Sequence, residues 1–293
     1  MSAVDSLLIG AVDLHCHSGP SPMPRRITHA EAARQAGEAG FRAIVAKCHY
    51  HDTVTDILAM APLLAGLSVQ VFGGIALNSQ NGGLNPFAVD RSLKMGGKVI
   101  WFPTISSRAH LRYSDGDEHV RAHFQPRGMM PSEEVSIFGA DGDLKPAVHQ
   151  IIGQARAAGA LISTGHLGPE PARALVEAAA AAGHDRLVVS HPNFVVAMER
   201  QQAVELAGLG ATIEHELGMY HNERRFAFAE LLEWINLIGP ERTSLASDLG
   251  QVGNALPVEA YRQVVGDLLD SGISERDIRL MIRDNPARLI GLD

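Results

Sequence analysis

Eight short β-like runs alternate with alanine-rich helical segments along this chain, and this alternation is the feature that most restricts its fold. A strand that connects through a helix to the next parallel strand makes a right-handed crossover, so repeated units predict a parallel α/β sheet covered by helices. At eight units we expect closure into a (β/α)8 barrel, the TIM barrel. The predicted strands are residues 8–15, 43–48, 69–77, 98–103, 160–165, 187–190, 211–216 and 244–248.

The segments between these runs carry the signals of helix ends. Thr28 and Glu31 have the spacing of a capping box at the start of a predicted helix, and glycine follows several helical segments, as is usual at helix C-termini. No glycine-rich phosphate-binding pattern follows the first run, which disfavours a dinucleotide-binding fold. The predicted helices include residues 28–39, 169–182, 199–209, 223–238 and 257–270.

The length agrees with one barrel domain over residues 1–293, because such barrels have roughly 250 residues or more. Residues 105–143 form an inserted loop after the fourth predicted strand, longer than usual connections and rich in arginine and histidine. We expect a partly ordered lid over the C-terminal ends of the strands, with a small hairpin around residues 139–142. The alternative is a disordered surface insertion.

Composition limits the partners of the chain. The net charge of −8 argues against nucleic acid, since phosphate binding needs clustered lysine and arginine. No stretch of about 18 uncharged apolar residues predicts a membrane span, and the first residues do not resemble a secretory signal. With only two cysteines we expect a reducing, cytoplasmic location. A small-molecule substrate and a homo-oligomer are the expected partners.

Histidine and aspartate recur where predicted strands end. His15 and His17 are two residues apart, so a strand would point both to one face. His166, His191 and Asp248 end the fifth, sixth and eighth predicted strands. A barrel brings these ends around one mouth. Burying such groups is unfavourable unless they are paired or bind a metal, so the set favours a metal site over ordinary core packing.

This pattern resembles the amidohydrolase superfamily of metal-dependent hydrolases, in a bacterial branch. The resemblance covers nearly the whole chain; it is specific at superfamily level and does not name a substrate. It includes a C-terminal sequence, Asp284-Asn-Pro-Ala-Arg-Leu-Ile-Gly-Leu292, that is typical of a short helix after the barrel. It is carried by His15-x-His17, His166, His191, Asp248, Lys47-x-His49 and Gly82-Gly-Leu-Asn-Pro86.

The resemblance implies an enzyme that hydrolyses an amide, cyclic amide or lactone bond of a small molecule. It implies one or two divalent metal ions, zinc in the first place and manganese or iron as alternatives. His15, His17 and Asp248 would bind the more buried metal, while His166 and His191 would bind or flank a second metal or orient the substrate. Asp248 would also accept the proton of the attacking water, whose pKa a metal lowers from about 15.7 to about 7.

One departure from the superfamily pattern concerns the metal bridge. Many two-metal members carry a carboxylated lysine or a glutamate at the end of the fourth strand, where this chain has Thr104. Lys47 and His49 share a face at the end of the second predicted strand and are the best substitutes. Lys47 is expected to be a catalytic residue: it could be carboxylated and bridge two metals, or bind an anionic substrate. The structural alternative is that Lys47 forms only an ion pair at the mouth of the barrel.

Other residues are weaker candidates. His49, Arg108 and Asn78 are predicted to bind substrate, with Arg108 clamping a carboxylate. A solvated arginine and a turn-forming asparagine are the structural alternatives. Asp13 is expected to share the face of His15 and to hydrogen-bond an imidazole. Glu214 and His215 are adjacent, so one of them must face into the barrel.

Three other functions stay open at this stage. A single-metal decarboxylase or hydratase of the same superfamily fits the missing bridge. A metal-dependent phosphoesterase can also begin with Asp-x-His-x-His, but the ending of this chain argues against it. A barrel that has lost its activity would bind no stoichiometric metal.

Overall fold

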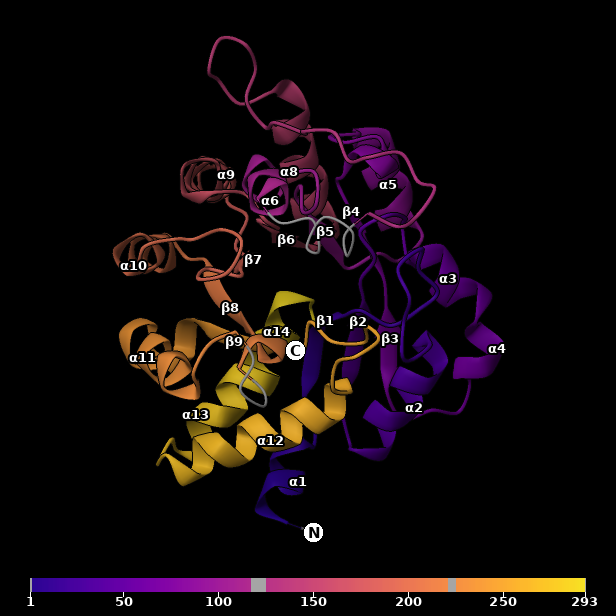
Figure 1. Cartoon of the computed structure of the whole chain (residues 1–293), viewed down its shortest axis with the longest axis vertical. Helices are drawn as coiled ribbons and strands as arrows, with labels where there is room; N and C mark the ends of the chain where they lie inside the picture. The colour runs from indigo at the N-terminus through magenta and orange to yellow at the C-terminus, as the bar shows by residue number, and fades with distance from the viewer. Residues whose placement is uncertain (1, 117–124, 221–224, 293) are drawn as a thin grey trace.

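The strands form a ring with helices around it in the computed structural model, which describes residues 2–116, 125–220 and 225–292 (Figure 1). Neighbouring strands are parallel throughout the ring. In chain order the strands are β1 (Val12–Cys16), β2 (Ala43–Ala46), β3 (Gln70–Phe72), β4 (Gly74–Ala76), β5 (Val99–Trp101), β6 (Leu161–Ser163), β7 (Leu187–Ser190), β8 (Thr212–Glu216) and β9 (Thr243–Ala246).

The ring is made of two sheets joined at two places. One sheet has the order β1-β2-β3 and the other β4-β5-β6-β7-β8-β9. Only Gly73 separates β3 from β4, so they are consecutive parts of one barrel position. At the other seam, the Asp248 amide donates to the His15 carbonyl at 2.8 Å, and the His17 amide donates to the Leu249 carbonyl at 2.8 Å. The chain is therefore a (β/α)8 barrel, as predicted.

Two predicted strands need correction. Residues 8–15 do not form one strand, because α1 (Ala3–Leu8) precedes β1 and buries Leu7 and Leu8 against the outer core. The strand over residues 69–77 is divided at Gly73, where an added Cβ would lie only 2.6 Å from the Val54 amide nitrogen. The sequence shows apolar character in both segments but not these close approaches.

Helices cover the outside of the ring, and four of the five predicted helical ranges agree with observed helices to within one residue at each end. The capping box of Thr28 and Glu31 begins α2, as predicted. The bounds are α2 (His29–Glu38), α3 (Val54–Ala59), α4 (Ala61–Leu64), α5 (Pro86–Lys94), α6 (Arg108–Asp115), α8 (Pro146–Ala158), α9 (Pro169–Ala181), α10 (Arg200–Gly208), α11 (Phe228–Ile238), α12 (Pro257–Asp270), α13 (Glu275–Arg279) and α14 (Asn285–Leu289).

The described part of the insertion over residues 105–143 contains helix α6 and returns to the barrel through the predicted hairpin. Phe138 and Leu144 form an antiparallel bridge there. Residues 117–124 of this insertion and residues 221–224 lie outside the described residues. The predicted helix over 223–238 is shorter than expected, because residues 225–227 are not helical and α11 begins at Phe228. The lid role assigned to residues 105–143 stays a prediction.

A β-bulge in β1 decides which side chains enter the barrel. Asp13 pairs with Ile44, whereas Cys16 pairs with Ala46, so three steps on β1 match two on β2. As a result Leu14 packs in the barrel interior and the next residue, His15, faces inward as well. Asp13 and Cys16 face the surrounding helices, which corrects the expectation that Asp13 shares a face with His15.

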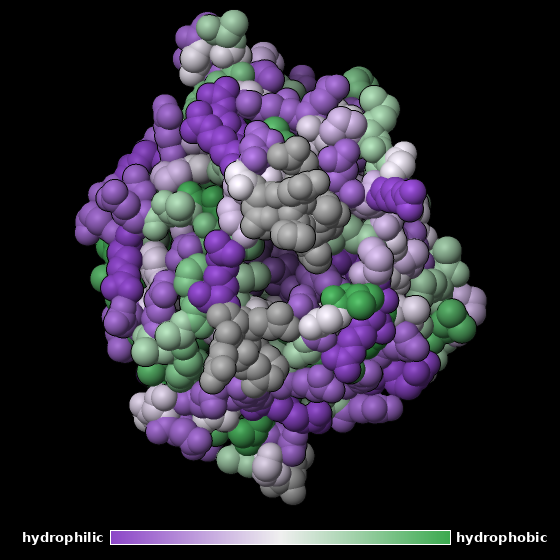
Figure 2. Space-filling view, in the orientation of Figure 1, coloured by the Kyte–Doolittle hydropathy of each residue, from purple (hydrophilic) through white to green (hydrophobic). Residues whose placement is uncertain are grey.

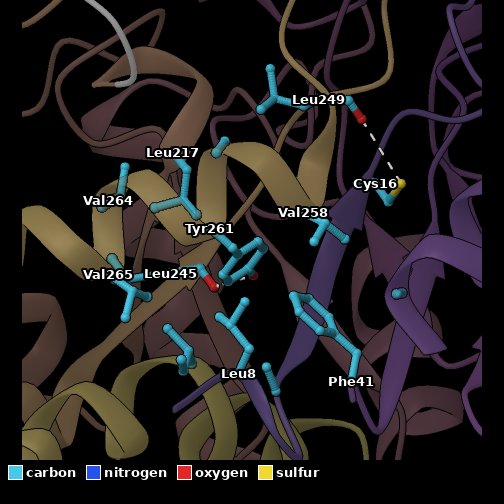
Figure 3. Packing of buried hydrophobic residues seen from close by; sticks show 14 of the residues in the cluster. Leu8, Cys16, Phe41, Leu217, Leu245, Leu249, Val258, Tyr261, Val264 and Val265 are labelled. Atoms are coloured by element: carbon cyan, nitrogen blue, oxygen red, sulfur yellow. Dashed lines mark hydrogen bonds between the residues drawn. The ribbon is translucent and has the colours of Figure 1, made fainter. Parts of the chain in front are cut away.

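Two apolar layers hold the site in place. The interior layer includes Leu14, Val45, Trp101 and Leu161, and the C-terminal helix α14 contributes Leu289 to it. The outer layer lies between strands and helices; Figure 3 shows Phe41 and Tyr261, whose rings meet edge to face at 5.0 Å. Within the described residues, none of the helices combines the length and apolar character needed to cross a membrane.

Candidate metal centre

Three donor atoms converge where β1 and β9 end. His15 Nε2 lies 3.3 Å from Asp248 Oδ1, and His17 Nε2 lies 3.1 Å from the same oxygen. The three side chains are buried, and their ligand atoms lie within 4.8 Å of one another. Two imidazoles and one carboxylate are ligands that zinc and similar divalent ions accept. This is the set that the sequence predicts for the more buried metal.

Glu214 on β8 fixes the orientation of His15. Glu214 Oε1 lies 3.3 Å from His15 Nδ1 and accepts a hydrogen bond of 2.8 Å from the Ser190 hydroxyl. A carboxylate that accepts from one ring nitrogen leaves the other lone pair available, which is the usual arrangement behind a metal-binding histidine. Glu214 therefore directs His15 Nε2 toward His17 and Asp248.

A second donor set shares His15. His191 and Glu216 join it, with His191 Nδ1 3.2 Å from Glu216 Oε2 and His15 Nδ1 3.9 Å from Glu216 Oε1. His15 faces this set through Nδ1 and the first set through Nε2. A neutral imidazole has one free lone pair, so His15 can serve only one of the two sets as a neutral ligand.

Two observations indicate that these side chains can bind a metal: several of the imidazole rings are neutral, and one buried ring nitrogen lacks a hydrogen bond. Burial holds the pKa of His17 and of His166 well below the ordinary value and lowers the pKa of His191 to about 3, so these rings are neutral. His191 Nδ1 is buried and forms no hydrogen bond with a described group, although Glu216 Oε2 lies 3.2 Å away. A buried nitrogen without a hydrogen bond is unfavourable, and a cation would satisfy it.

Charge is distributed unevenly over the acidic groups. Burial raises the pKa of Asp248, but His15 and His17 outweigh it and hold that pKa well below its usual range. Burial and Lys47 lower the pKa of His15, whereas Asp248 and Glu214 raise it, with a net value of about 9. Burial, followed by the Glu214 charge, raises the pKa of Glu216 well above normal. The metal-free site thus holds protons that a cation would displace.

Lys47 and His49 follow β2 and lie in different surroundings. Lys47 is fully buried, with Nζ 2.7 Å from His15 Nε2 and 5.6 Å from the centre of the Trp101 ring. Burial lowers its pKa to about 8. The His49 ring lies 4.8 Å from the His17 ring, and its Nδ1 is 2.9 Å from Thr104 Oγ1. Lys47 thus contacts a metal ligand directly, whereas His49 faces the cavity.

His166 lies beside the donor sets rather than in them. Its ring is 5.0 Å from that of His191, and its Nδ1 is 2.9 Å from Nδ1 of His110, a residue of α6 in the insertion. One of these two nitrogens must carry a proton and the other must accept it. The insertion therefore supplies a buried group to the site, although the sequence did not single out His110.

The backbone is strained at two of the candidate ligands. His191 and Asp248 have φ values of 54° and 52°, a left-handed conformation that costs non-glycine residues free energy. Gly250 has φ 135°, and a Cβ there would lie 2.3 Å from the His17 carbonyl oxygen. The loop after β9 is thus pressed against the end of β1, which explains how Asp248 reaches His15 and His17.

A cavity of about 360 Å³ opens above these residues. Figure 2 views the molecule in the orientation of Figure 1, with hydrophilic residues in the hollow at the centre. Its lining combines the site residues with aromatic, methionine and amide side chains. The described lining residues are His17, Met23, Arg25, His49, Tyr113, His166, His191, Phe194, Gly218, Met219, Asp248, Leu249, Gln251 and Asn254.

Two predicted substrate-binding residues lie elsewhere. Arg108 is exposed on α6, pairs with Glu134 at 2.9 Å and does not line the cavity. Asn78 is buried and donates to the His49 carbonyl at 2.9 Å and to Thr104 Oγ1 at 2.6 Å, so it supports the loop that carries His49. Neither side chain is placed to contact a molecule in the cavity.

Sequence reasoning did not assign Glu216 and Arg25 to the site. Glu214 and Glu216 are two residues apart on β8, so their shared face was a signal of the same kind as His15 and His17. Arg25 lies in the loop after β1, and only the contact of that loop with residues 250–254 brings it to the cavity.

The fold is shared with several solved structures. An amidohydrolase from Pseudomonas aeruginosa is 12% identical, with a TM-score of 0.63 over 99% of this chain and 100% of that chain. The probable dipeptidase PvdM from the same organism is 13% identical, with a TM-score of 0.64 over 98% and 96%. A variant of a PTE-like lactonase from Deinococcus radiodurans is 16% identical, with a TM-score of 0.58 over 99% and 98%.

These likenesses show the barrel fold that the chain shares with the three proteins. At the level of sequence, the chain belongs to DUF6282, a family of unknown function whose profile matches residues 10–214. The match includes His15, His17 and His191 and ends before Asp248. No curated protein matches the chain.

Proposed function

We propose that this protein is a metal-dependent hydrolase that acts on an amide, cyclic amide or lactone bond of a small molecule. The observation that carries the proposal is the convergence of His15 Nε2, His17 Nε2 and Asp248 Oδ1 beneath the cavity, with Glu214 behind His15. The similar structures are named as an amidohydrolase, a probable dipeptidase and a lactonase, which agrees with this bond class. Zinc is the proposed metal, because the ligands are mainly imidazoles.

The residues at the mouth of the barrel have different roles in the proposed reaction. A divalent cation, when bound, polarises a carbonyl as a Lewis acid and lowers the pKa of bound water to about 7. Asp248 Oδ1 is positioned beside both histidines and accepts a proton as general base. His191 and His166 line the cavity, and their neutral rings position the substrate, while Asp248 passes the proton that it accepted to the leaving group. Burial of the whole set excludes bulk water.

We assign Lys47 to the metal side of the site rather than to substrate, because its Nζ contacts His15 and does not line the cavity. A lysine reacts with carbon dioxide only as a neutral amine, and burial lowers the pKa of Lys47 toward that state. A carbamate on Lys47 would be detected as a ¹³C resonance after growth in ¹³C-bicarbonate. The Lys47→Met variant should lack the resonance; a spectrum without it in the native protein would leave Lys47 a cationic neighbour of His15.

Elemental analysis of the purified protein tests the proposal. We expect stoichiometric zinc, or manganese or iron, in the native chain, and its loss together with amidase and lactonase activity in His15→Ala and Asp248→Asn. His184→Ala is the matched control, since His184 is buried before β7 at the opposite end of the strands and hydrogen-bonds the Arg186 carbonyl. Full metal content and activity in both site variants would contradict the proposal.

A second candidate is a single-metal decarboxylase or hydratase of the same superfamily. It is favoured by the sharing of His15 between the two donor sets and by Thr104 in place of a bridging carboxylate. A count of one metal per chain that is unchanged in Glu216→Gln would support single-metal chemistry. A count of two that falls to one in Glu216→Gln would favour the two-metal hydrolase.

A further inference from the structure

Arg25 is held at the cavity wall by two loops that pack together. Arg25 forms an antiparallel bridge with Gln251, and the Arg26 amide donates to the Gly250 carbonyl at 2.8 Å. The Arg26 side chain also donates to the Asn254 carbonyl at 2.7 Å. These contacts fix the backbone of Arg25 beside the loop that carries Asp248, so its side chain is directed rather than free in solvent.

The guanidinium of Arg25 has no carboxylate partner among the described residues. Its Nε is shielded from solvent without a hydrogen bond, and in the described ranges no carboxylate lies close enough to form an ion pair with it. A guanidinium keeps its charge and has five donors, so leaving it mostly buried and unpaired is unfavourable. Donors of this guanidinium are therefore available to an anion in the cavity.

Within the described residues, the side-chain contact of Arg25 with His17 does not supply an acceptor. Arg25 Nη2 lies 3.4 Å from His17 Nδ1. Because His17 directs Nε2 toward Asp248, a metal-binding His17 carries its proton on Nδ1 and offers Arg25 no acceptor. The contact then brings two donors together, and an anion beside them would accept from both.

The remainder of the cavity wall indicates the other part of the ligand. Tyr113 and Phe194 meet edge to face at 5.3 Å, and Met219 adds an apolar surface. Arg225 stacks on both rings and donates to the Tyr113 hydroxyl at 2.9 Å, so that cation is already engaged. Among the described residues that line the cavity, Arg25 is the permanent positive charge.

We propose that Arg25 binds a carboxylate of the substrate, so that the enzyme acts on small amides, cyclic amides or lactones that carry a free carboxylate and an apolar or aromatic group. This inference rests on the proposed function for the bond that is cleaved. A single guanidinium matches a carboxylate through two parallel hydrogen bonds. A cavity of about 360 Å³ lies at the small end of ligand pockets, which suits a molecule of the size of an acylated amino acid.

Equilibrium binding of two matched probes tests the inference without turnover. Hippurate has an aromatic ring, an amide and a carboxylate, and hippuramide replaces only the carboxylate by a neutral amide. By calorimetry on the metal-depleted full chain, which does not cleave the amide, we expect hippurate to bind roughly 10- to 100-fold more tightly than hippuramide, as hydrogen bonds to charged groups allow. Arg25→Met should remove this difference, and Arg25→Lys should retain part of it.

Arg34→Met is the matched control, because Arg34 is exposed on α2 and does not line the cavity. It should keep the preference for hippurate. Equal binding of the two probes, binding of neither, or an equal loss in Arg25→Met and Arg34→Met would overturn the inference. Tighter binding of phenyl phosphate than of hippurate would overturn the assignment to a carboxylate.

The two proposals fail in distinguishable ways. If the chain binds no metal but prefers hippurate through Arg25, the anion site stands and the hydrolase is wrong. If the chain binds zinc and hydrolyses amides while Arg25→Met leaves probe binding unchanged, the hydrolase stands and the carboxylate site is wrong.

Discussion

The two ends of the barrel interior are built by the same strands and have opposite chemistry. At the N-terminal end, Leu14, Trp101 and Leu161 fill the interior with apolar side chains, and helix α14 closes it. One or two residues further along, the strands place imidazoles and carboxylates that are just as deeply buried. The difference teaches that burial has two purposes here: the lower layer stabilises the fold, while the upper layer keeps charged and neutral donors in fixed positions for a ligand.

Removing the largest side chain of the lower layer should have the largest effect on stability. Trp101 is fully buried, and its ring lies 6.4 Å from that of His15. We expect Trp101→Ala to lower the free energy of unfolding by about 3–5 kcal/mol through lost burial and a new cavity. Urea unfolding measures this change. A loss as small as that of an exposed apolar control, Phe87→Ala, would show that the lower layer is not the stabilising layer.

A substitution behind the metal site should act on metal affinity far more than on stability. Glu214→Gln keeps an acceptor for Ser190 but removes the charge that orients His15. We expect a roughly 10- to 100-fold weaker zinc affinity, as is typical when a partner of a metal-binding histidine is replaced. Competition with a chelator gives the affinity, and urea unfolding of the metal-free protein gives the stability. An equal decrease in zinc affinity and in the stability of the metal-free protein would show that the two layers do not have separate roles.

A buried histidine outside the mouth should affect only the pH dependence of stability. Burial lowers the pKa of His29 to about 4, although Asp56 opposes this shift. The unfolded chain therefore takes up the proton first as the pH falls below 6.5, and stability declines until about pH 4, where it levels off. We expect a loss on the order of 1–2 kcal/mol between about pH 6.5 and 5.

The loss should be smaller in His29→Gln and unchanged in His149→Gln, whose side chain is exposed on α8. Urea unfolding at a series of pH values provides the comparison. An identical pH profile in native protein and His29→Gln would show that other groups control acid stability.

The sequence was sufficient to predict the barrel and the residues at its strand ends. Alternation of apolar runs with helix signals defined the repeating unit, and His15, His17, His191 and Asp248 fell at equivalent places in it. The bounds of β7 and α12 agree with the predicted ranges. These features depend on local pattern, which a single sequence contains.

Other features depend on contacts between distant segments and could not be predicted in the same way. The bulge in β1 follows from its pairing with β2, and it moved Asp13 out of the barrel while bringing His15 in. Arg25 reaches the cavity only because its loop packs on residues 250–254. Arg108 had a suitable charge, but its pairing with exposed Glu134 places it elsewhere.

The seam between β9 and β1 has a consequence for the order in which the protein is made. His15 and His17 leave the ribosome more than 200 residues before Asp248 and the loop at Gly250. Local segments can order during synthesis, but the loop that joins these residues spans most of the chain and closes at an entropic cost. A metal held by this set would bind only the finished barrel and would stabilise it by mass action. Cofactor loading would thereby distinguish complete chains from truncated ones.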